Sequence, residues 1–220
     1  MMTNLFSAFD PANSINMSMN WTSTMISIMI MPSMFWMVPS RFEMTFKLLM
    51  TKMHQEFKLM MKNKGFTLTL VSMFMFILLN NIMGLMPYVF TSSSHLTFTL
   101  TMALPMWTSM MMFGWLNNTE HMLSHLIPAG TPTMLMPFMV CIETISNMIR
   151  PGSLAVRLTA NMIAGHLLMT LLGNNTNNAT NIMLMSMMIV QMALMTFETA
   201  VSIIQAYVFS MLSSLYSSEV

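Results

Sequence analysis

The sequence predicts an all-α polytopic membrane protein, and three observations carry this prediction. The 220 residues are 55% hydrophobic and only 7% charged, with a mean hydropathy of +0.64, whereas soluble domains carry about 25% charged residues. Several apolar segments reach about 17 residues or more, the length that a helix needs to span a bilayer. Six of the eight basic residues lie between residues 41 and 64, so positive charge is concentrated outside the apolar segments.

The N-terminal part predicts one span and one surface helix. Residues 1–20 are polar and mixed, as in a short tail or surface segment. A first span fits residues 22–38, which contain Pro32 and stop before Pro39; it is barely long enough to cross the hydrocarbon core. Residues 41–64 alternate basic side chains with Phe, Leu and Met at spacings of three and four. That pattern predicts an amphipathic helix lying in the membrane interface.

Two ordinary spans and a loop follow. Residues 65–86 form an apolar segment closed by Pro87, and residues 95–116 form another with Pro105 inside it. Both are long enough to cross a bilayer as helices. The next residues, 117–132, are polar and are predicted to be a loop.

The C-terminal part contains two apolar segments that are too long for simple spans. Residues 134–172 and 179–215 would each reach about 55 Å as helices, against a hydrocarbon core of about 30 Å. The turn-forming run Gly173–Asn178 separates them, so they predict an antiparallel hairpin. A mismatch of this size demands steep tilt or kinks. We therefore predict three spans, one interfacial helix and a long, steeply tilted two-helix hairpin, all in one membrane domain covering residues 1–220.

Charge and methionine content predict the compartment and the orientation. Animal mitochondrial genomes read AUA as methionine, and the chain has 37 methionines, many of them where Leu or Ile would serve. We therefore expect an organelle-encoded protein without an Arg- and Ser-rich transit peptide. The positive-inside rule then places residues 41–64 on the matrix side. The hairpin would begin on the matrix side, turn near Asn175 on the intermembrane side, and return.

Charged residues inside the apolar region are candidate functional residues by default. From Gly65 to Ser218 the acidic and basic residues are Glu120, Glu143, Arg150, Arg157 and Glu198. Arg157 stands out because arginine cannot be deprotonated in a protein, and a charge at bilayer depth costs about 2.5–3.5 kcal/mol. Long apolar stretches flank it on both sides, which weakens the alternative that it simply snorkels to the headgroups.

The spacing of polar residues predicts a hydrophilic path between the two long helices. Residues seven apart on a helix drift by only about 20°, so a stripe on each helix is polar. The first stripe consists of Glu143, Arg150, Arg157 and Asn161, and the second of Gln191, Glu198, Ser202 and Gln205. The first helix also carries small residues, which allow another helix to approach its backbone closely. They are Ala155, Ala160, Ala164 and Gly165.

The motif Leu154-Ala-Val-Arg-Leu-Thr-Ala-Asn-Met-Ile-Ala-Gly-His166, together with Ile203-Ile-Gln-Ala-Tyr-Val-Phe209, resembles subunit a of the mitochondrial ATP synthase membrane sector. The resemblance covers nearly the whole chain, including Asn81–Pro87. It implies the stator half of a rotary proton channel, with its hairpin tilted against a ring of c subunits that each carry a carboxylate. It also implies that Arg157 attracts the ionised ring carboxylate and separates two aqueous half-channels.

The resemblance further implies roles for individual side chains. Glu143 matches the acidic residue of the matrix-side outlet, and Glu219 falls near a second one. His166 and Glu198 match the pair on the intermembrane-side inlet. The remaining matches, Asn161 and Gln205, are polar residues beside the arginine. No family role carries over to Arg150.

The implied partners are the c-subunit ring, other membrane and peripheral-stalk subunits of the ATP synthase, the lipid bilayer and protons. We expect no nucleic acid, no cofactor and no catalysis by the chain alone. His121 and His125 have a metal-ligand spacing beside Glu120, but no third ligand is near in sequence, so no metal is expected. Cys141 is the single cysteine, which leaves no disulfide and no thiolate metal site.

Three other classes fit the sequence less well. A carrier or channel without a rotor, with Arg157 binding an anionic substrate, predicts inverted repeats and matching broken helices, and the sequence has neither. A purely structural assembly subunit would not need two polar stripes. A redox subunit would need axial histidine pairs in its spans, and His166 is the only histidine deep in the long hairpin.

Overall fold

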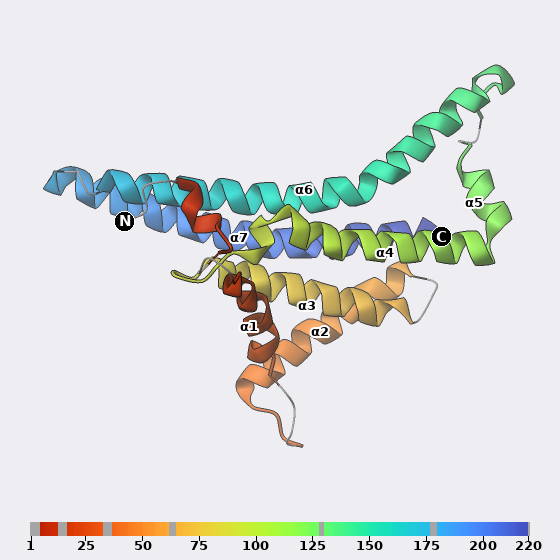
Figure 1. Ribbon diagram of the computed structural model, residues 1–220. Coiled ribbons are helices and arrows are strands. Elements are labelled where there is room, and N and C mark those ends of the chain that lie inside the picture. Colours follow the sequence, from red (N-terminus) through yellow and green to blue (C-terminus); the bar gives the residue numbers. More distant parts are fainter. Residues whose placement is uncertain are drawn as a thin grey trace.

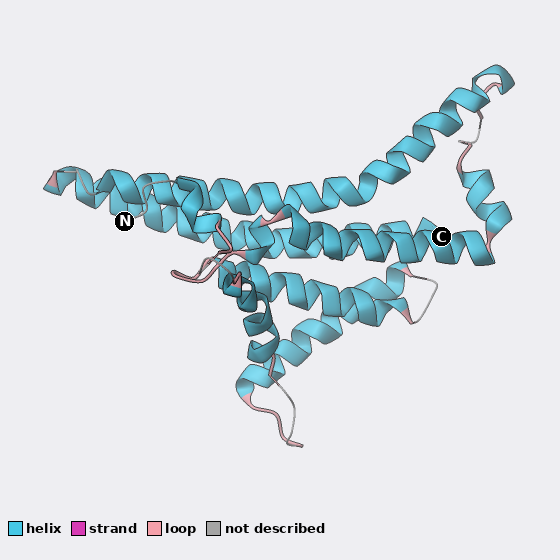
Figure 2. Ribbon diagram, in the orientation of Figure 1, coloured by secondary structure: helices cyan, strands magenta, loops and turns pink. Residues whose placement is uncertain are grey.

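The computed structural model describes residues 5–12, 17–32, 37–61, 65–127, 130–176 and 180–219. Over these ranges the chain is helical, with seven α-helices and a few short 3-10 turns (Figures 1 and 2). The α-helices are α1 (Ser23–Ile30), α2 (Arg41–Met60), α3 (Phe66–Gly84), α4 (Leu96–Asn117), α5 (Thr119–His125), α6 (Met136–Thr176) and α7 (Asn181–Glu219).

Four segments are long and apolar enough to cross a membrane, which confirms the all-α polytopic class. They are Phe66–Gly84, Leu96–Asn117, Thr133–Thr176 and Ile182–Ser218. The helices within them, α3, α4, α6 and α7, lie alongside one another (Figure 1). Helix α3 packs on α7, α4 packs on α6, and α6 packs on α7.

The predicted span over residues 22–38 is not confirmed. Helix α1 ends at Ile30, and Met31 is extended, with φ −61° and ψ 120°. Pro32 follows, and a proline disfavours helical backbone at the residue before it. Eight residues of helix reach only about 12 Å, too short to cross a membrane. Residues 33–36 of that predicted span lie outside the described ranges.

Helix α2 is amphipathic, as the spacing of its apolar residues predicts. It begins with a capping box, in which the Ser40 hydroxyl accepts from the Glu43 backbone N–H and the Glu43 carboxylate accepts from the Ser40 N–H. Met53 and Phe57 are buried, whereas the basic residues Arg41, Lys47, Lys52 and Lys58 are exposed. Residues 62–64 of the predicted interfacial segment lie outside the described ranges.

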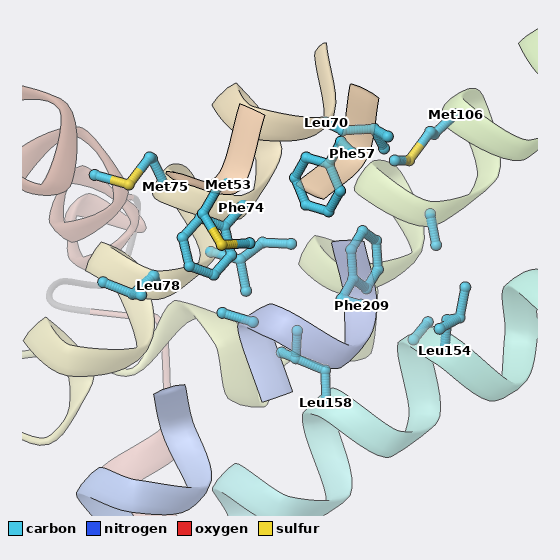
Figure 3. Close-up of a cluster of buried hydrophobic side chains, with 14 of the residues drawn as sticks. Met53, Phe57, Leu70, Phe74, Met75, Leu78, Met106, Leu154, Leu158 and Phe209 are labelled. Carbon is cyan, nitrogen blue, oxygen red and sulfur yellow. The ribbon is translucent and has the colours of Figure 1, made fainter. Parts of the chain in front are cut away.

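The core forms where α2, α3, α4, α6 and α7 meet (Figure 3). Phe57 of α2, Leu70 of α3 and Phe209 of α7 are almost fully buried there. Besides Phe209 and Glu198, the buried residues of α7 are small, namely Ser202, Ala206, Ser210, Ser213 and Ser214. The serine hydroxyls donate to backbone carbonyls three residues earlier in the helix, so they are satisfied locally. Their small size lets neighbouring helices approach closely.

The two C-terminal helices are unusually long. Helix α6 has 41 residues and α7 has 39, which corresponds to about 60 Å each. Helix α6 continues through Thr176, so part of the run predicted as a turn is helical; residues 177–179 lie outside the described ranges. Helix α6 is visibly bent (Figure 1), and Pro151 lies inside it, where it removes one backbone hydrogen bond.

Candidate functional site

Arg157 lies on an outward-facing side of α6. Its side chain is exposed, and in the described part of the chain it makes no hydrogen bond or ion pair. Ser153, Ala160 and Ala164, at helical spacings from it, are also exposed. The guanidinium therefore projects from a narrow helix face that leaves room for another helix to approach.

A cavity of about 840 Å³ lies at one end of the bundle. Its walls come from the N-terminal segment, the loop after α3, and helices α6 and α7. We call it the His166 cavity, because its ionisable lining includes His166 of α6 and Glu198 of α7. Gln191, one member of the predicted α7 stripe, lines it as well.

The two main ionisable groups of the His166 cavity each have a buried atom that lacks a hydrogen-bond partner among the described residues. Glu198 is only 9% exposed, and His166 is half-buried. His166 Nε2 and Glu198 Oε1 are both buried and have no hydrogen-bond partner among the described residues. Buried polar atoms are normally paired with protein or with water. Both side chains line the same cavity, but these two atoms have almost no surface exposed to it.

Gly165 explains how Glu198 reaches this position. A Cβ atom added to Gly165 would lie 2.7 Å from Glu198 Cδ and 2.8 Å from Glu198 Oε1. The glycine therefore lets the carboxylate of α7 pack directly against the α6 backbone. The sequence predicted a close helix approach at this glycine, and the group that makes it is Glu198.

A second, smaller and mostly apolar cavity lies beside the first and contains three polar side chains. It measures about 320 Å³ and is lined by Glu198 and Gly165 together with Asn161 and Gln205. Glu198 thus forms a wall shared by both cavities. Asn161 is four residues after Arg157, about one helical turn away along α6. The predicted neighbours of the arginine, Asn161 and Gln205, and the predicted inlet pair therefore line two cavities that share Glu198.

A different cavity, of about 500 Å³, lies between α4, α5, α6 and the last turns of α7. We call it the Glu143 cavity. Arg150 Nη2 lies 3.3 Å from Glu143 Oε1 in an ion pair, and the guanidinium carbon lies 5.0 Å from the centre of the Tyr216 ring, within cation–π range. The remaining titratable side chain in the lining is His125.

The two cavities lie at opposite ends of the bundle. The His166 cavity is lined by the end of α3 and the loop that follows it, whereas the Glu143 cavity is lined by the C-terminal half of α4 and by α5. Because α3 and α4 are consecutive helices that run in opposite directions (Figure 1), these regions lie at opposite ends. Arg157 belongs to the stretch of α6 between Glu143 and His166.

The predicted polar stripe of α6 is thus divided among different surroundings. Glu143 and Arg150 line one cavity and Asn161 another, while Arg157 is exposed between them. Glu219 is the last residue of α7. Its side chain is outside the described part of the structure.

Two lining residues of the Glu143 cavity were missed from the sequence. Tyr216 follows Gln205 by 11 residues, a spacing that returns to the same helix face and could have extended the α7 stripe. His125 was considered only as half of a metal pair. The His121 and His125 ring centres are 4.4 Å apart, but no group of three or more His, Cys, Asp or Glu side chains among the described residues could hold a metal ion.

Comparison with known proteins decides the family. A family model described as ATP synthase A chain matches residues 16–218. This chain belongs to the ATP synthase subunit a family. Its relatives include proteins named ATP synthase subunit a from Aedes albopictus and Locusta migratoria, each 58% identical, and from Drosophila melanogaster, 55% identical. Each alignment covers 100% of both chains.

Family membership confirms the resemblance carried by Leu154–His166 and Ile203–Phe209. Together with the four apolar helices, the insect subunit a relatives identify a multi-pass protein of the mitochondrial inner membrane. The roles that the subunit a family implies for individual side chains remain predictions.

Proposed function

We propose that this chain is the proton-translocating stator subunit of a rotary ATP synthase, with two half-channels on opposite sides of Arg157. The observation that carries the proposal is the placement of a permanent cation on an exposed face between two cavities, at opposite ends of the bundle, that each contain ionisable side chains. The chain is not catalytic on its own; it couples proton flow to rotation of its partner ring.

The His166 cavity is the inlet in this proposal. A proton from intermembrane water reaches His166 or Glu198, whose buried Nε2 and Oε1 atoms have no hydrogen-bond partner among the described residues. Histidine suits such a relay because it titrates near neutrality. The smaller cavity, with Asn161 and Gln205 in its lining, then leads the proton toward a carboxylate on the c-subunit ring.

Arg157 keeps the two half-channels apart. An ionised ring carboxylate is attracted to the guanidinium, and a neutral one is free to rotate into lipid. A guanidinium never gives up its proton in a protein, so it attracts the carboxylate without itself carrying protons across. A lysine would lack this property, because a buried ammonium group can deprotonate.

The Glu143 cavity is the outlet. A ring carboxylate that has passed Arg157 releases its proton toward Glu143, and the cavity around that residue leads to the matrix side. Glu219 is a second candidate acid at this end, from its place at the end of α7. The positive-inside rule supports the matrix assignment, because the exposed basic residues of α2 precede α3 and fix the orientation of the spans that follow.

The long hairpin is steeply tilted in this proposal. Helices α6 and α7, at about 60 Å, are twice the thickness of the hydrocarbon core. An upright helix would expose apolar side chains to water at about 25 cal/mol per Å². Tilt also lays the exposed face of α6 around Arg157 along the flank of the ring. Helix axes within about 40° of the membrane normal, in a density map of the assembled membrane sector, would contradict the tilt.

The partners that follow are the c-subunit ring, the other membrane and peripheral-stalk subunits, and lipid. The exposed face of α6 around Arg157 supports the contact with the ring, because Ser153, Ala160 and Ala164 leave it narrow. Isolation of the intact membrane sector should recover a ring of small subunits that each carry one carboxylate. Its absence would favour a channel without a rotor.

Substitution of Arg157 tests the proposal. Arg157→Lys should abolish most proton-driven ATP synthesis in membrane vesicles while the complex still assembles. Arg157→Ala should lose synthesis and also leak protons, because no fixed charge separates the half-channels. Normal synthesis by Arg157→Lys complexes would contradict the proposed role.

A further inference from the structure

The N-terminal segment forms a wall of the His166 cavity, although its composition predicts only a tail or surface segment. Its 3-10 turn, Leu5–Phe9, lies against α6 (Figure 1). The edge of the Phe9 ring meets the His166 imidazole, with centroids 6.3 Å apart and planes at 89°. Phe9 and Asp10 line the cavity together with His166 and Glu198.

Asp10 is held at the mouth of this cavity. Its carboxylate Oδ1 accepts from the Ala12 backbone N–H at 3.1 Å, and its carbonyl accepts from Asn20 Nδ2 at 3.1 Å. The side chain is exposed to water. The cavity lining therefore contains one exposed carboxylate, Asp10, and one buried carboxylate, Glu198.

The charge of the cavity favours the approach of protons. Its titratable lining residues are Asp10, Tyr88, His166 and Glu198, and the described lining includes no Lys or Arg. A cleft lined by one sign of charge raises the local concentration of the opposite ion. The inner carboxylate, Glu198, is 9% exposed and its Oε1 has no partner among the described residues. It needs a proton supply from outside.

We propose that Asp10 is the outer proton-collecting group of the inlet. This inference rests on the proposed function of the His166 cavity and adds a residue that neither the motif nor the spacing points to. Hydronium or a protonated buffer gives its proton to the Asp10 carboxylate. The proton then passes through cavity water to His166 or Glu198, and Asp10 returns to its ionised form.

The test measures proton-driven ATP synthesis in vesicles that contain the whole complex, at low and high concentrations of a small buffer, imidazole, on the intermembrane side. Asp10→Asn keeps the shape of the side chain but removes its charge and its proton affinity. At low buffer the rate should fall about fivefold, the factor by which one unit charge enriches a cation at contact in water. At high buffer the rate should recover, because imidazole delivers protons directly into the cavity.

Two variants make the result specific. Asp10→Glu retains a carboxylate and should keep most of the rate of synthesis at low buffer. If the loss in Asp10→Asn came instead from poor assembly after any change at this position, Asp10→Glu would lose the rate as well. Glu120→Gln removes an exposed carboxylate from α5, at the other end of the bundle, and should have no effect. Rates are expressed per assembled complex.

The proposal is overturned if Asp10→Asn leaves the rate at low buffer unchanged, or if its defect is the same at every buffer concentration. Glu198→Gln separates this outcome from failure of the proposed function. If Glu198→Gln is blocked at all buffer concentrations while Asp10→Asn is normal, only the role of Asp10 is wrong. If both variants are normal, the inlet itself is wrongly assigned.

Discussion

The His166 cavity and the Glu143 cavity differ in the interactions that their ionisable side chains make. In the first, His166 Nε2 and Glu198 Oε1 are buried without a hydrogen-bond partner among the described residues. In the second, Glu143 is ion-paired with Arg150, which also lies over the ring of Tyr216. Unpaired buried polar atoms are costly, and exchange of water or protons at the first cavity would offset that cost. We infer that the proposed inlet exchanges protons with unpaired groups, whereas the proposed outlet contains a fixed ion pair.

The largest expected effect comes from removing Glu198, the acid of the proposed inlet. Glu198→Gln keeps the size of the side chain but cannot carry a proton, and general acid–base groups contribute about 10²-fold or more. Proton-driven synthesis should fall by about that factor, and its dependence on intermembrane-side pH should flatten because one titrating group is lost. Rate measurements at several external pH values check both effects. An unchanged rate and pH profile would show that protons bypass Glu198.

A second substitution moves Glu198 without changing its chemistry. In Gly165→Ala the added Cβ would lie only 2.7 Å from Glu198 Cδ, so the carboxylate must shift. A displacement of about 1 Å in a reacting group costs about 10²-fold, and we expect a loss close to that of Glu198→Gln. The matched control is Gly173→Ala, because a Cβ there meets nothing within 4 Å. Equal rates of synthesis for the Gly165 and Gly173 variants would show that the contact between Gly165 and Glu198 does not position the carboxylate for proton transfer.

A smaller effect is expected when the ion pair of the proposed outlet is broken. Arg150 and Glu143 retain 24% and 32% side-chain exposure, and pairs that water reaches contribute about 1 kcal/mol or less. Arg150→Gln should therefore change the rate of synthesis by about fivefold at most. A double-mutant cycle with Glu143→Gln should be non-additive, since the two side chains touch. Strict additivity would indicate that the pair has no role in proton release.

The fold could be predicted further than the site. Apolar runs of the length of α3, α4, α6 and α7 specify long membrane helices whatever their partners, because the bilayer leaves few alternatives. The first predicted span is not confirmed because Pro32 follows α1 so soon. The motif around Arg157 identified the family, and the spacing of polar residues placed Glu198, Asn161 and Gln205 near one another.

What the sequence could not show depends on tertiary contacts. Periodicity placed Arg150 and Arg157 on one stripe, yet Arg150 lines a cavity and Arg157 is exposed; Pro151 lies between them in a bent helix. Tyr216 meets Arg150 only because α6 and α7 pack together. Asp10 is far from His166 in sequence, and no periodic pattern connects an N-terminal 3-10 turn to a residue deep in α6.

Sided accessibility tests the central claim most directly. Cys141 is the only cysteine, so Cys141→Ser provides a background in which single cysteines can replace Gln191, in the His166 cavity, and Thr144, in the Glu143 cavity. A small, membrane-impermeant thiol reagent is then added to one side of sealed vesicles that contain the assembled complex. Gln191→Cys should react only from the intermembrane side, and Thr144→Cys only from the matrix side. Reaction of both positions from the same side would contradict two half-channels separated at Arg157.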